Sequence, residues 1–205
     1  FVSFLNDREM RMDEATTERV LQDSMFELDN LSAYLGKLKD MVCADERETL
    51  LRPSAFNLRE LVEKVVRLTN IPAGKKVSFS TAFPPDMPDL TADPVHVANV
   101  LSNLIENAIK YSGEEVNIDI VVLWNQQGVE LTVSDNGFGI APDERRKVFE
   151  KFYRSSHLPD KQIPGIGLGL SYVRQIVEAH HGSVSLRSEL GEGTRITINL
   201  PTTAL

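Results

Sequence analysis

Two amides and a lysine share one stripe of a predicted helix over residues 94–112. Asn103, Asn107 and Lys110 are spaced by four and three residues, which places their side chains on one helical face. Amide oxygens are neutral ligands for a hard cation, and a lysine ammonium donates hydrogen bonds to phosphate. The stripe therefore indicates a site for a cation and a phosphate, although an ordinary polar helix face with a terminal lysine has the same pattern.

An aspartate and two glycines follow a predicted strand at residues 135–140, which read Asp-Asn-Gly-Phe-Gly-Ile. Glycine lets a ligand approach the backbone closely. The Asp135 carboxylate can accept a hydrogen bond from an exocyclic amine such as that of adenine. A simple Asn-Gly turn is the alternative interpretation.

A second glycine-rich segment, Gly165-Ile166-Gly167-Leu168-Gly169-Leu170, opens a predicted helix over residues 170–181. Its glycines expose backbone N–H groups beside a helix N-terminus, an arrangement that attracts anions. A dinucleotide-binding fingerprint requires a strand directly before its glycines, and none is predicted here. A P-loop is also absent, because no glycine-rich run ends in Gly-Lys-Ser or Gly-Lys-Thr. If this chain binds a nucleotide, it uses neither of these two common loops.

The composition is that of an ordinary globular protein, with 41% hydrophobic and 25% charged residues among 205. The net charge of -8 argues against non-specific binding of nucleic acid, which needs a cationic face. Cys43 is the single cysteine, so an internal disulfide and a multi-thiolate metal site are excluded. No apolar run is long enough to cross a bilayer and no signal peptide opens the sequence, so we expect no membrane segment in this chain.

The first part of the chain has the pattern of a bundle helix over residues 13–42. Apolar residues recur every seven positions at Leu21, Leu28, Leu35 and Val42, and a second set interleaves with them. This spacing is typical of the seam of a helical bundle or coiled coil, and an amphipathic helix on a single-chain core is the alternative. Residues 43–57, with a polar run and a proline, are predicted to be a linker.

The rest of the chain mixes strands and helices without strict alternation. Asn57 is a plausible cap for a helix that follows it, and Asp93-Pro94 is a strong helix start, because a carboxylate caps the helix and proline fits its first position. The apolar stripe of this second helix is formed by Val97, Leu101, Leu104, Ala108 and Tyr111. We expect helices over 58–69, 94–112, 143–150 and 170–181, and strands over 77–83, 116–123, 129–134, 183–188 and 194–200. An antiparallel-rich sheet with helices on one face accommodates this order.

Taken together, five segments in this order resemble the boxes of the ATP-binding domain of sensor histidine kinases, within the family of gyrase, Hsp90 and MutL. Residues 103–112 match its N box, 135–140 its G1 box, 149–154 its F box, 165–170 its G2 box, and 191–194 its last glycine box. The resemblance covers residues 57–201, and the helix over 13–42 resembles the second helix of the family's dimerisation and phosphoacceptor hairpin. It implies two domains: a hairpin remnant at 1–50 and a catalytic ATP-binding domain at 51–205.

The resemblance implies an α+β fold, a two-layer α/β sandwich whose mixed, antiparallel-rich sheet is covered by helices on one face. ATP and Mg²⁺ would lie between the N-box helix and a lid at 141–168. The γ-phosphoryl would pass to a histidine on the hairpin, and then to an aspartate of a response regulator receiver domain. The protein would be a homodimer through the hairpin, in the cytoplasmic part of a membrane-associated receptor.

By the same resemblance, Asn107 is the Mg²⁺ ligand and Asn103 lies close to the metal or its waters. Lys110 reaches the phosphates and Arg154 the γ-phosphate, so the catalytic roles fall on Asn103, Lys110 and Arg154. Asp135 takes the adenine amine. The other expected nucleotide contacts are Tyr111, Gly137, Gly139, Ile140, Gly165, Gly167, Leu168, Gly169, Leu170 and Thr194.

Two differences from the family's pattern bear on the reaction, one at position 103 and one in the histidines. In the gyrase branch a glutamate acts as the hydrolytic base where this chain has Asn103, and an amide cannot be a base. That difference favours transfer to an imidazole over hydrolysis. None of the chain's histidines, His96, His157, His180 and His181, has the sequence setting of the family's acceptor. A serine kinase of the same superfamily and a non-catalytic nucleotide-binding scaffold are the alternatives.

Overall fold

The computed structural model describes residues 50–157, 163 and 165–201, within the unit Thr49–Leu205. The predicted helix over 13–42 lies outside these residues. The elements are β1 (Ser54–Phe56), α3 (Leu58–Leu68), β2 (Lys76–Ala82), β3 (Leu90–Ala92), α4 (Pro94–Lys110), β4 (Glu115–Asn125), β5 (Gly128–Asp135), the 3-10 helix η1 (Lys147–Phe149), α5 (Gly169–Ala179), β6 (Ser183–Glu189) and β7 (Gly193–Pro201).

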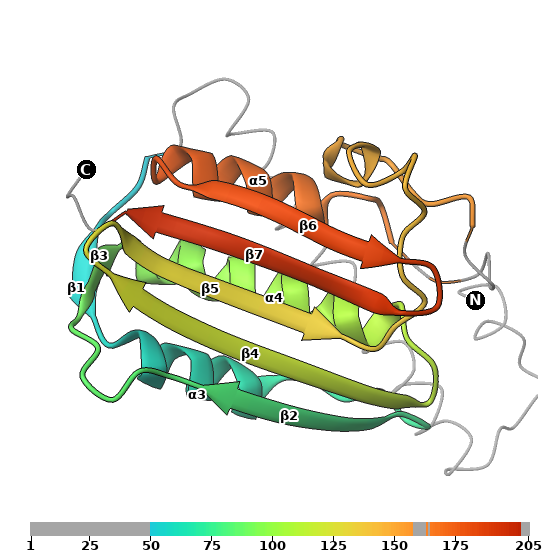
Figure 1. Ribbon diagram of the computed structural model, residues 1–205, viewed down its shortest axis with the longest axis horizontal. Coiled ribbons are helices and arrows are strands. Elements are labelled where there is room, and N and C mark those ends of the chain that lie inside the picture. The colour runs from blue at the N-terminus through green and yellow to red at the C-terminus, as the bar shows by residue number, and fades with distance from the viewer. Residues whose placement is uncertain (1–49, 158–162, 164, 202–205) are drawn as a thin grey trace, which may run out of the picture. The chain divides into compact units, whose positions relative to one another are not determined.

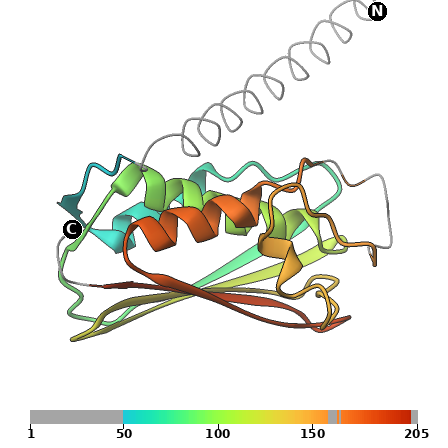
Figure 2. The same ribbon diagram turned by 90° about the horizontal axis from the view of Figure 1, so that it is seen from above.

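The main sheet has five strands in the order β2-β4-β5-β7-β6, with β2 and β4 parallel and the other neighbours antiparallel. Helices α3, α4 and α5 lie on one face of this sheet, as the two views show (Figure 1 and Figure 2). The expected two-layer sandwich with a mixed sheet is therefore confirmed. In the described part of the chain, no helix is both long and apolar enough to cross a bilayer.

Alternation along β4 explains why the sheet has one covered face. Val116, Ile118, Ile120 and Val122 are buried, whereas the residues between them are exposed or half-buried. A strand turns successive side chains to opposite faces, so this pattern places the apolar set under the helices. Helix α4 completes the core with seven buried apolar residues: Val97, Val100, Leu101, Leu104, Ile105, Ala108 and Ile109.

Both predicted helix starts are observed. The Asn57 side chain accepts from the Glu60 amide at 3.1 Å and caps α3. The Asp93 side chain accepts from the amides of Val95 and His96 and caps α4. Short polar side chains accept hydrogen bonds from the free amides of a first helical turn, so these two helix starts could be predicted from the sequence.

Three local predictions are wrong. The predicted linker over 43–57 contains strand β1, which pairs with β3 in a separate two-stranded sheet. The predicted helix over 143–150 is reduced to η1 at Lys147–Phe149, and the Glu144 side chain before it turns inward to accept hydrogen bonds from Tyr153 and Ser156. Tyr111, expected on the buried stripe of α4, is the half-buried residue that ends the helix.

Candidate functional site

The asparagines of α4 face the first residue of α5. A Cβ atom added at Gly169 would lie 3.2 Å from Asn103 Oδ1 and 3.5 Å from Asn107 Nδ2. Asn103 Nδ2 donates to the Asn99 carbonyl at 2.8 Å, which orients the amide so that its oxygen faces Gly169. Two sequence-predicted segments, 66 residues apart at Asn103 and Gly169, are thus brought together at a helix N-terminus.

Lys110 lies against the other end of the same glycine-rich segment. A Cβ at Gly165 would lie 2.2 Å from Lys110 Nζ, so a side chain at this position would displace the ammonium from where it lies. Nζ also lies 4.9 Å from the centroid of the Tyr111 ring, within the range of a cation–π contact. The predicted phosphate-binding lysine therefore lies beside backbone that carries no side chain.

Asp135 ends β5 with one carboxylate oxygen held by backbone donors. Its Oδ1 accepts from the Gly137 amide at 2.8 Å and from the Thr194 amide at 3.2 Å. No described residue donates to Oδ2. Burial raises the pKa of Asp135, and the two backbone hydrogen bonds lower it in part. A half-buried acceptor with a free oxygen is suited to a ligand that brings a donor.

The G1 segment packs on the end of α4. The Phe138 amide donates to the Tyr111 carbonyl at 2.9 Å, and a Cβ at Gly137 would lie 2.6 Å from that carbonyl oxygen. Gly139 has φ +71°, and a Cβ there would overlap the carbonyl oxygen of Glu189. Glycine is therefore required at both positions for the loop to approach its neighbours this closely.

A buried hydroxyl that the sequence analysis missed joins the G1 segment to the last glycine box. Ser188 Oγ accepts from the Ile140 amide at 2.8 Å, donates to the Gly193 carbonyl at 2.7 Å, and lies 3.0 Å from Thr194 Oγ1. The available signal was the alternation of β6, in which Val184 and Leu186 precede Ser188 on the inward face. A polar side chain on the inward, otherwise apolar face of a strand needs hydrogen-bond partners.

Glu144 organises the segment after β5 and was also missed. Its buried carboxylate accepts from the Tyr153 hydroxyl at 2.9 Å, the Ser156 amide at 2.9 Å and the Ser155 hydroxyl, and His157 Nδ1 lies 3.3 Å away. Burial raises the pKa of Glu144, but these donors, Ser155 first, lower it to about 2. Burial, and then Glu144, raises the pKa of Tyr153 to about 12. Nothing in the sequence indicated that the Glu144 carboxylate is buried.

Arg154, the expected γ-phosphate contact, is exposed and donates to the Ile163 carbonyl at 2.5 Å. Burial raises the pKa of the Tyr111 phenol, and the charge of Arg154 lowers it in part. Gly167 has φ +77°, and a Cβ there would lie 2.5 Å from the Tyr153 carbonyl oxygen.

The donor set around α4 fits a magnesium ion that arrives with phosphates. No cluster of three or more His, Cys, Asp or Glu residues able to hold a metal occurs in the described ranges. Mg²⁺ keeps several waters and is held in nucleotide sites by one or two protein groups plus phosphate oxygens. Asn107, whose amide faces Gly169, is the group that would hold it.

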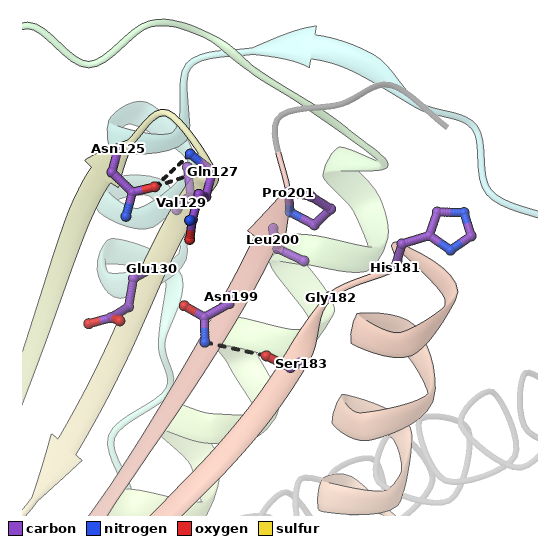
Figure 3. Close-up of a pocket in the computed structure, with 11 residues that line it drawn as sticks. Asn125, Gln127, Val129, Glu130, His181, Gly182, Ser183, Asn199, Leu200 and Pro201 are labelled. Carbon is purple, nitrogen blue, oxygen red and sulfur yellow. Dashed lines mark hydrogen bonds between the residues drawn. The ribbon is translucent and has the colours of Figure 1, made fainter.

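A cavity of about 400 Å³ lies elsewhere, at the opposite end of the sheet (Figure 3). It is lined by the β4–β5 turn, the start of β6 and the end of β7, where Gly128 pairs with Pro201. Asp135 pairs with Thr194 at the other end of the same two strands. None of the sequence-predicted site residues lines this cavity.

Residues 92–204 match the family described as histidine kinase-, DNA gyrase B-, and HSP90-like ATPase. The sensor protein RprX of Bacteroides fragilis (strain YCH46) is 34% identical over 201 residues, covering 96% of this chain and 35% of RprX. The catalytic domain of the histidine kinase ThkA aligns at 26% identity with a TM-score of 0.63, covering 74% of this chain and 97% of that domain.

A full-length ShkA structure in complex with AMPPNP aligns with a TM-score of 0.77 at 23% identity, covering 96% of this chain and 41% of that one. The chain spans 35% to 52% of the length of RprX and of three adaptive-response sensory kinases. Its likeness to ThkA and ShkA supports the two-layer fold described above.

Proposed function

Because the chain belongs to the histidine kinase-, DNA gyrase B-, and HSP90-like ATPase family, we propose that it is the catalytic region of a two-component sensor histidine kinase. It binds ATP with Mg²⁺ and transfers the γ-phosphoryl to a histidine on a helical hairpin. The observation that carries the proposal is the convergence of α4 on the glycines of the G2 segment. Asn103 and Asn107 face Gly169, and Lys110 faces Gly165.

At one end of the site, the residues are suited to hold adenine. Asp135 Oδ2 accepts from the exocyclic amine, and Tyr111 and Ile140 line the base. Gly137 and Gly139 keep the loop close enough to its neighbours for the pocket to form, as their missing Cβ atoms indicate. Thr194, whose amide donates to Asp135, supports the carboxylate from the neighbouring strand.

At the other end, the phosphates lie between α4 and the N-terminus of α5. The amides of Gly165, Gly167 and Gly169 donate to phosphate oxygens, and the helix dipole of α5 favours their negative charge. Leu168 and Leu170 hold this segment on the helix. Lys110 donates to the phosphates, while Asn107 and, through water, Asn103 hold the cation.

The transfer step needs an acceptor with its own nucleophilic nitrogen. An imidazole nitrogen forms a bond to the γ-phosphorus while the bond from that phosphorus to the β–γ bridging oxygen breaks, and ADP leaves. Lys110 and Arg154 stabilise the charge that develops on the transferring group. Magnesium, when bound, neutralises phosphate charge. Because Asn103 cannot deprotonate water, hydrolysis is disfavoured.

The acceptor belongs to the hairpin, of which residues 1–50 are a part, and residues 51–205 form the catalytic domain. His180 is not suited to be the acceptor, since both of its ring nitrogens are within hydrogen-bond distance of backbone atoms of Asp93 and Ile176. We propose a homodimer through the hairpin, a cytoplasmic location, and relay of the phosphoryl group to a response regulator receiver domain.

The stability of the product phosphate tests this proposal. A longer chain, in which a hairpin with its acceptor histidine precedes these residues, is incubated with γ-labelled ATP and Mg²⁺. The expected product is an acid-labile, base-stable phosphate, absent in Asp135→Ala and retained in Ser185→Ala, which alters an exposed hydroxyl of β6. Acid-stable phosphate alone would support the serine kinase, and nucleotide binding without transfer would support the scaffold.

A further inference from the structure

Glu144 is a buried carboxylate that has no role in the proposed reaction. It lies between the G1 segment and the F box, and only 1% of its surface is exposed. Burying a carboxylate costs much free energy unless it is paired or hydrogen-bonded. Four donors from three residues satisfy this one, and all of them lie 9 to 12 positions further along the chain. Glu144 therefore holds one short run of the chain, residues 153–156.

The hydrogen bonds of Glu144 occupy both of its oxygens. Oε1 accepts from the Tyr153 hydroxyl at 2.9 Å and from the Ser156 amide and hydroxyl at 2.9 and 3.0 Å, while Oε2 accepts from the Ser155 hydroxyl. Ser155 Oγ in turn accepts from the His157 amide at 3.2 Å. Hydrogen bonds to a charged acceptor are about twice as strong as those between neutral groups. The run is thus fixed by strong contacts to a single side chain.

Arg154 lies inside this run, and its own side chain bonds to a different segment. Nη2 donates to the Ile163 carbonyl at 2.5 Å. Ile163 stands two residues before Gly165, beside which the Lys110 ammonium lies. The buried carboxylate therefore fixes the backbone on both sides of Arg154, and the guanidinium ends next to the glycine-rich segment that is proposed to bind phosphates.

The backbone just before the run is strained. Phe152 has φ +66°, in the left-handed region, and its amide donates to the Gly167 carbonyl at 2.9 Å. A Cβ at Gly167 would lie 2.5 Å from the Tyr153 carbonyl oxygen, so the two segments are in close contact. An aromatic residue in this region costs free energy and persists only where its surroundings determine its conformation. Gly167 contacts this backbone before the run, and Glu144 holds it from within.

We propose that Glu144 is a positioning residue for Arg154. By holding the residues on both sides of Arg154, the carboxylate keeps the guanidinium at the glycine-rich segment, where the γ-phosphate of a bound nucleotide would meet it. Less ordering of the arginine is then required when the ligand binds. Glu144 itself touches neither nucleotide nor metal. This inference rests on the proposed nucleotide site and on the role proposed there for Arg154.

ADP and a non-hydrolysable ATP analogue provide the test, because they differ by the γ-phosphate. Their affinities are measured by calorimetry at fixed Mg²⁺ for the wild-type chain, Arg154→Ala, Glu144→Ala and the double variant. Arg154→Ala is expected to lower the preference for the ATP analogue over ADP about 20-fold, since a hydrogen bond to a charged group is lost. Glu144→Ala is expected to lower it about fivefold, the effect of one side chain that is no longer held in place. The double variant is expected to match Arg154→Ala alone.

Asp143→Ala is the matched control, since it removes the same charge from the neighbouring residue, which is exposed. Its preference is expected to equal that of the wild type. Equal losses of both affinities in Glu144→Ala, or a further loss of preference in the double variant, would overturn the proposal in favour of a purely structural role. If Glu144→Ala does not fold, Glu144→Gln decides in the same way, because one amide oxygen cannot accept from all four donors. Failure of the wild-type chain to bind either nucleotide would instead overturn the proposed site itself.

Discussion

The two ends of helix α4 use polar residues in opposite ways. At its N-terminal end, Asp93 accepts from the amides of Val95 and His96, and also from the amide of Arg52 at 2.8 Å. The Asp93 amide donates to His180 Nε2 at 3.0 Å. These protein groups satisfy one another, so this end of the helix is closed.

At the C-terminal end of α4, the side chains face glycine backbone. Asn107 makes no side-chain hydrogen bond within the described residues, and it lies beside Gly169. Lys110 lies beside Gly165, with its ammonium over the Tyr111 ring. Polar groups that satisfy one another stabilise a fold, whereas polar groups held next to backbone without side chains leave space for a ligand. The contrast predicts that substitutions at one end alter stability and at the other end alter binding.

The largest effect is expected at the closed end. Asp93→Ala removes a helix cap, worth about 1 kcal/mol, and the hydrogen bond from the Arg52 amide to a charged carboxylate, worth about 1.5–3 kcal/mol. We expect the free energy of unfolding to fall by about 3 kcal/mol in denaturant titration, with nucleotide affinity unchanged in the folded chain. Asp89→Ala, at a nearby exposed aspartate, is the control and should leave stability unchanged.

At the candidate nucleotide site, Asp135→Asn is expected to lower nucleotide affinity without lowering stability. The pKa of Asp135 is raised by burial, so its charge destabilises the free chain, and the neutral amide should keep or increase stability. Affinity for an ATP analogue is expected to fall about 30-fold, since a hydrogen bond to a charged group contributes about 1.5–3 kcal/mol. Titration calorimetry measures this affinity. Asp119→Asn, which alters an exposed aspartate of β4, is the control. A parallel loss of stability would contradict the contrast.

Gly169→Ala sharpens the comparison with a smaller change. The added Cβ would lie 3.2 Å from Asn103 Oδ1, closer than an ordinary van der Waals contact, and must displace that amide slightly. Alanine also favours helix by about 1 kcal/mol over glycine. We expect unchanged or higher stability and an ATP-analogue affinity reduced about tenfold. Gly113→Ala, where a Cβ meets nothing within 4 Å, should leave affinity unchanged.

The smallest effect is a pH dependence at the closed end. Burial lowers the pKa of His180, which is neutral in the fold because Nε2 accepts from the Asp93 amide. The unfolded chain binds more protons than the folded chain below the ordinary pKa of histidine, so stability falls as the pH falls from 7 towards 5. His180→Gln should flatten this slope in urea titrations. His181→Gln, at an exposed position, should retain it.

Several elements could be predicted because their signals are local. Asp93-Pro94 and the capping residue Asn57 specify helix starts, and the alternation of β4 specifies a half-covered strand. Strands β1 and β3 could not be predicted, because each has three residues and their pairing joins positions 34 to 38 residues apart. Pairing over such a distance depends on the folded core rather than on local pattern.

The candidate site likewise combines features that the sequence shows with features that only the folded chain shows. The residue types and order of the glycine segments were visible in the sequence, together with the asparagine stripe. Their meeting at Gly165 and Gly169 is tertiary and required the structure. Ser188 and Glu144 were missed because a buried polar side chain is identified by its partners, which lie 5 to 48 residues away.

Calorimetric titration with a non-hydrolysable ATP analogue, with and without Mg²⁺, tests most directly whether the open end of α4 is a nucleotide site. We expect binding that Asp135→Ala abolishes and whose Mg²⁺ dependence Asn107→Ala removes. Asn99→Ala, an exposed asparagine two helical turns away on the same stripe, should behave as the wild type. Absence of binding by the wild-type chain, or a Mg²⁺ dependence unchanged in Asn107→Ala, would contradict the account.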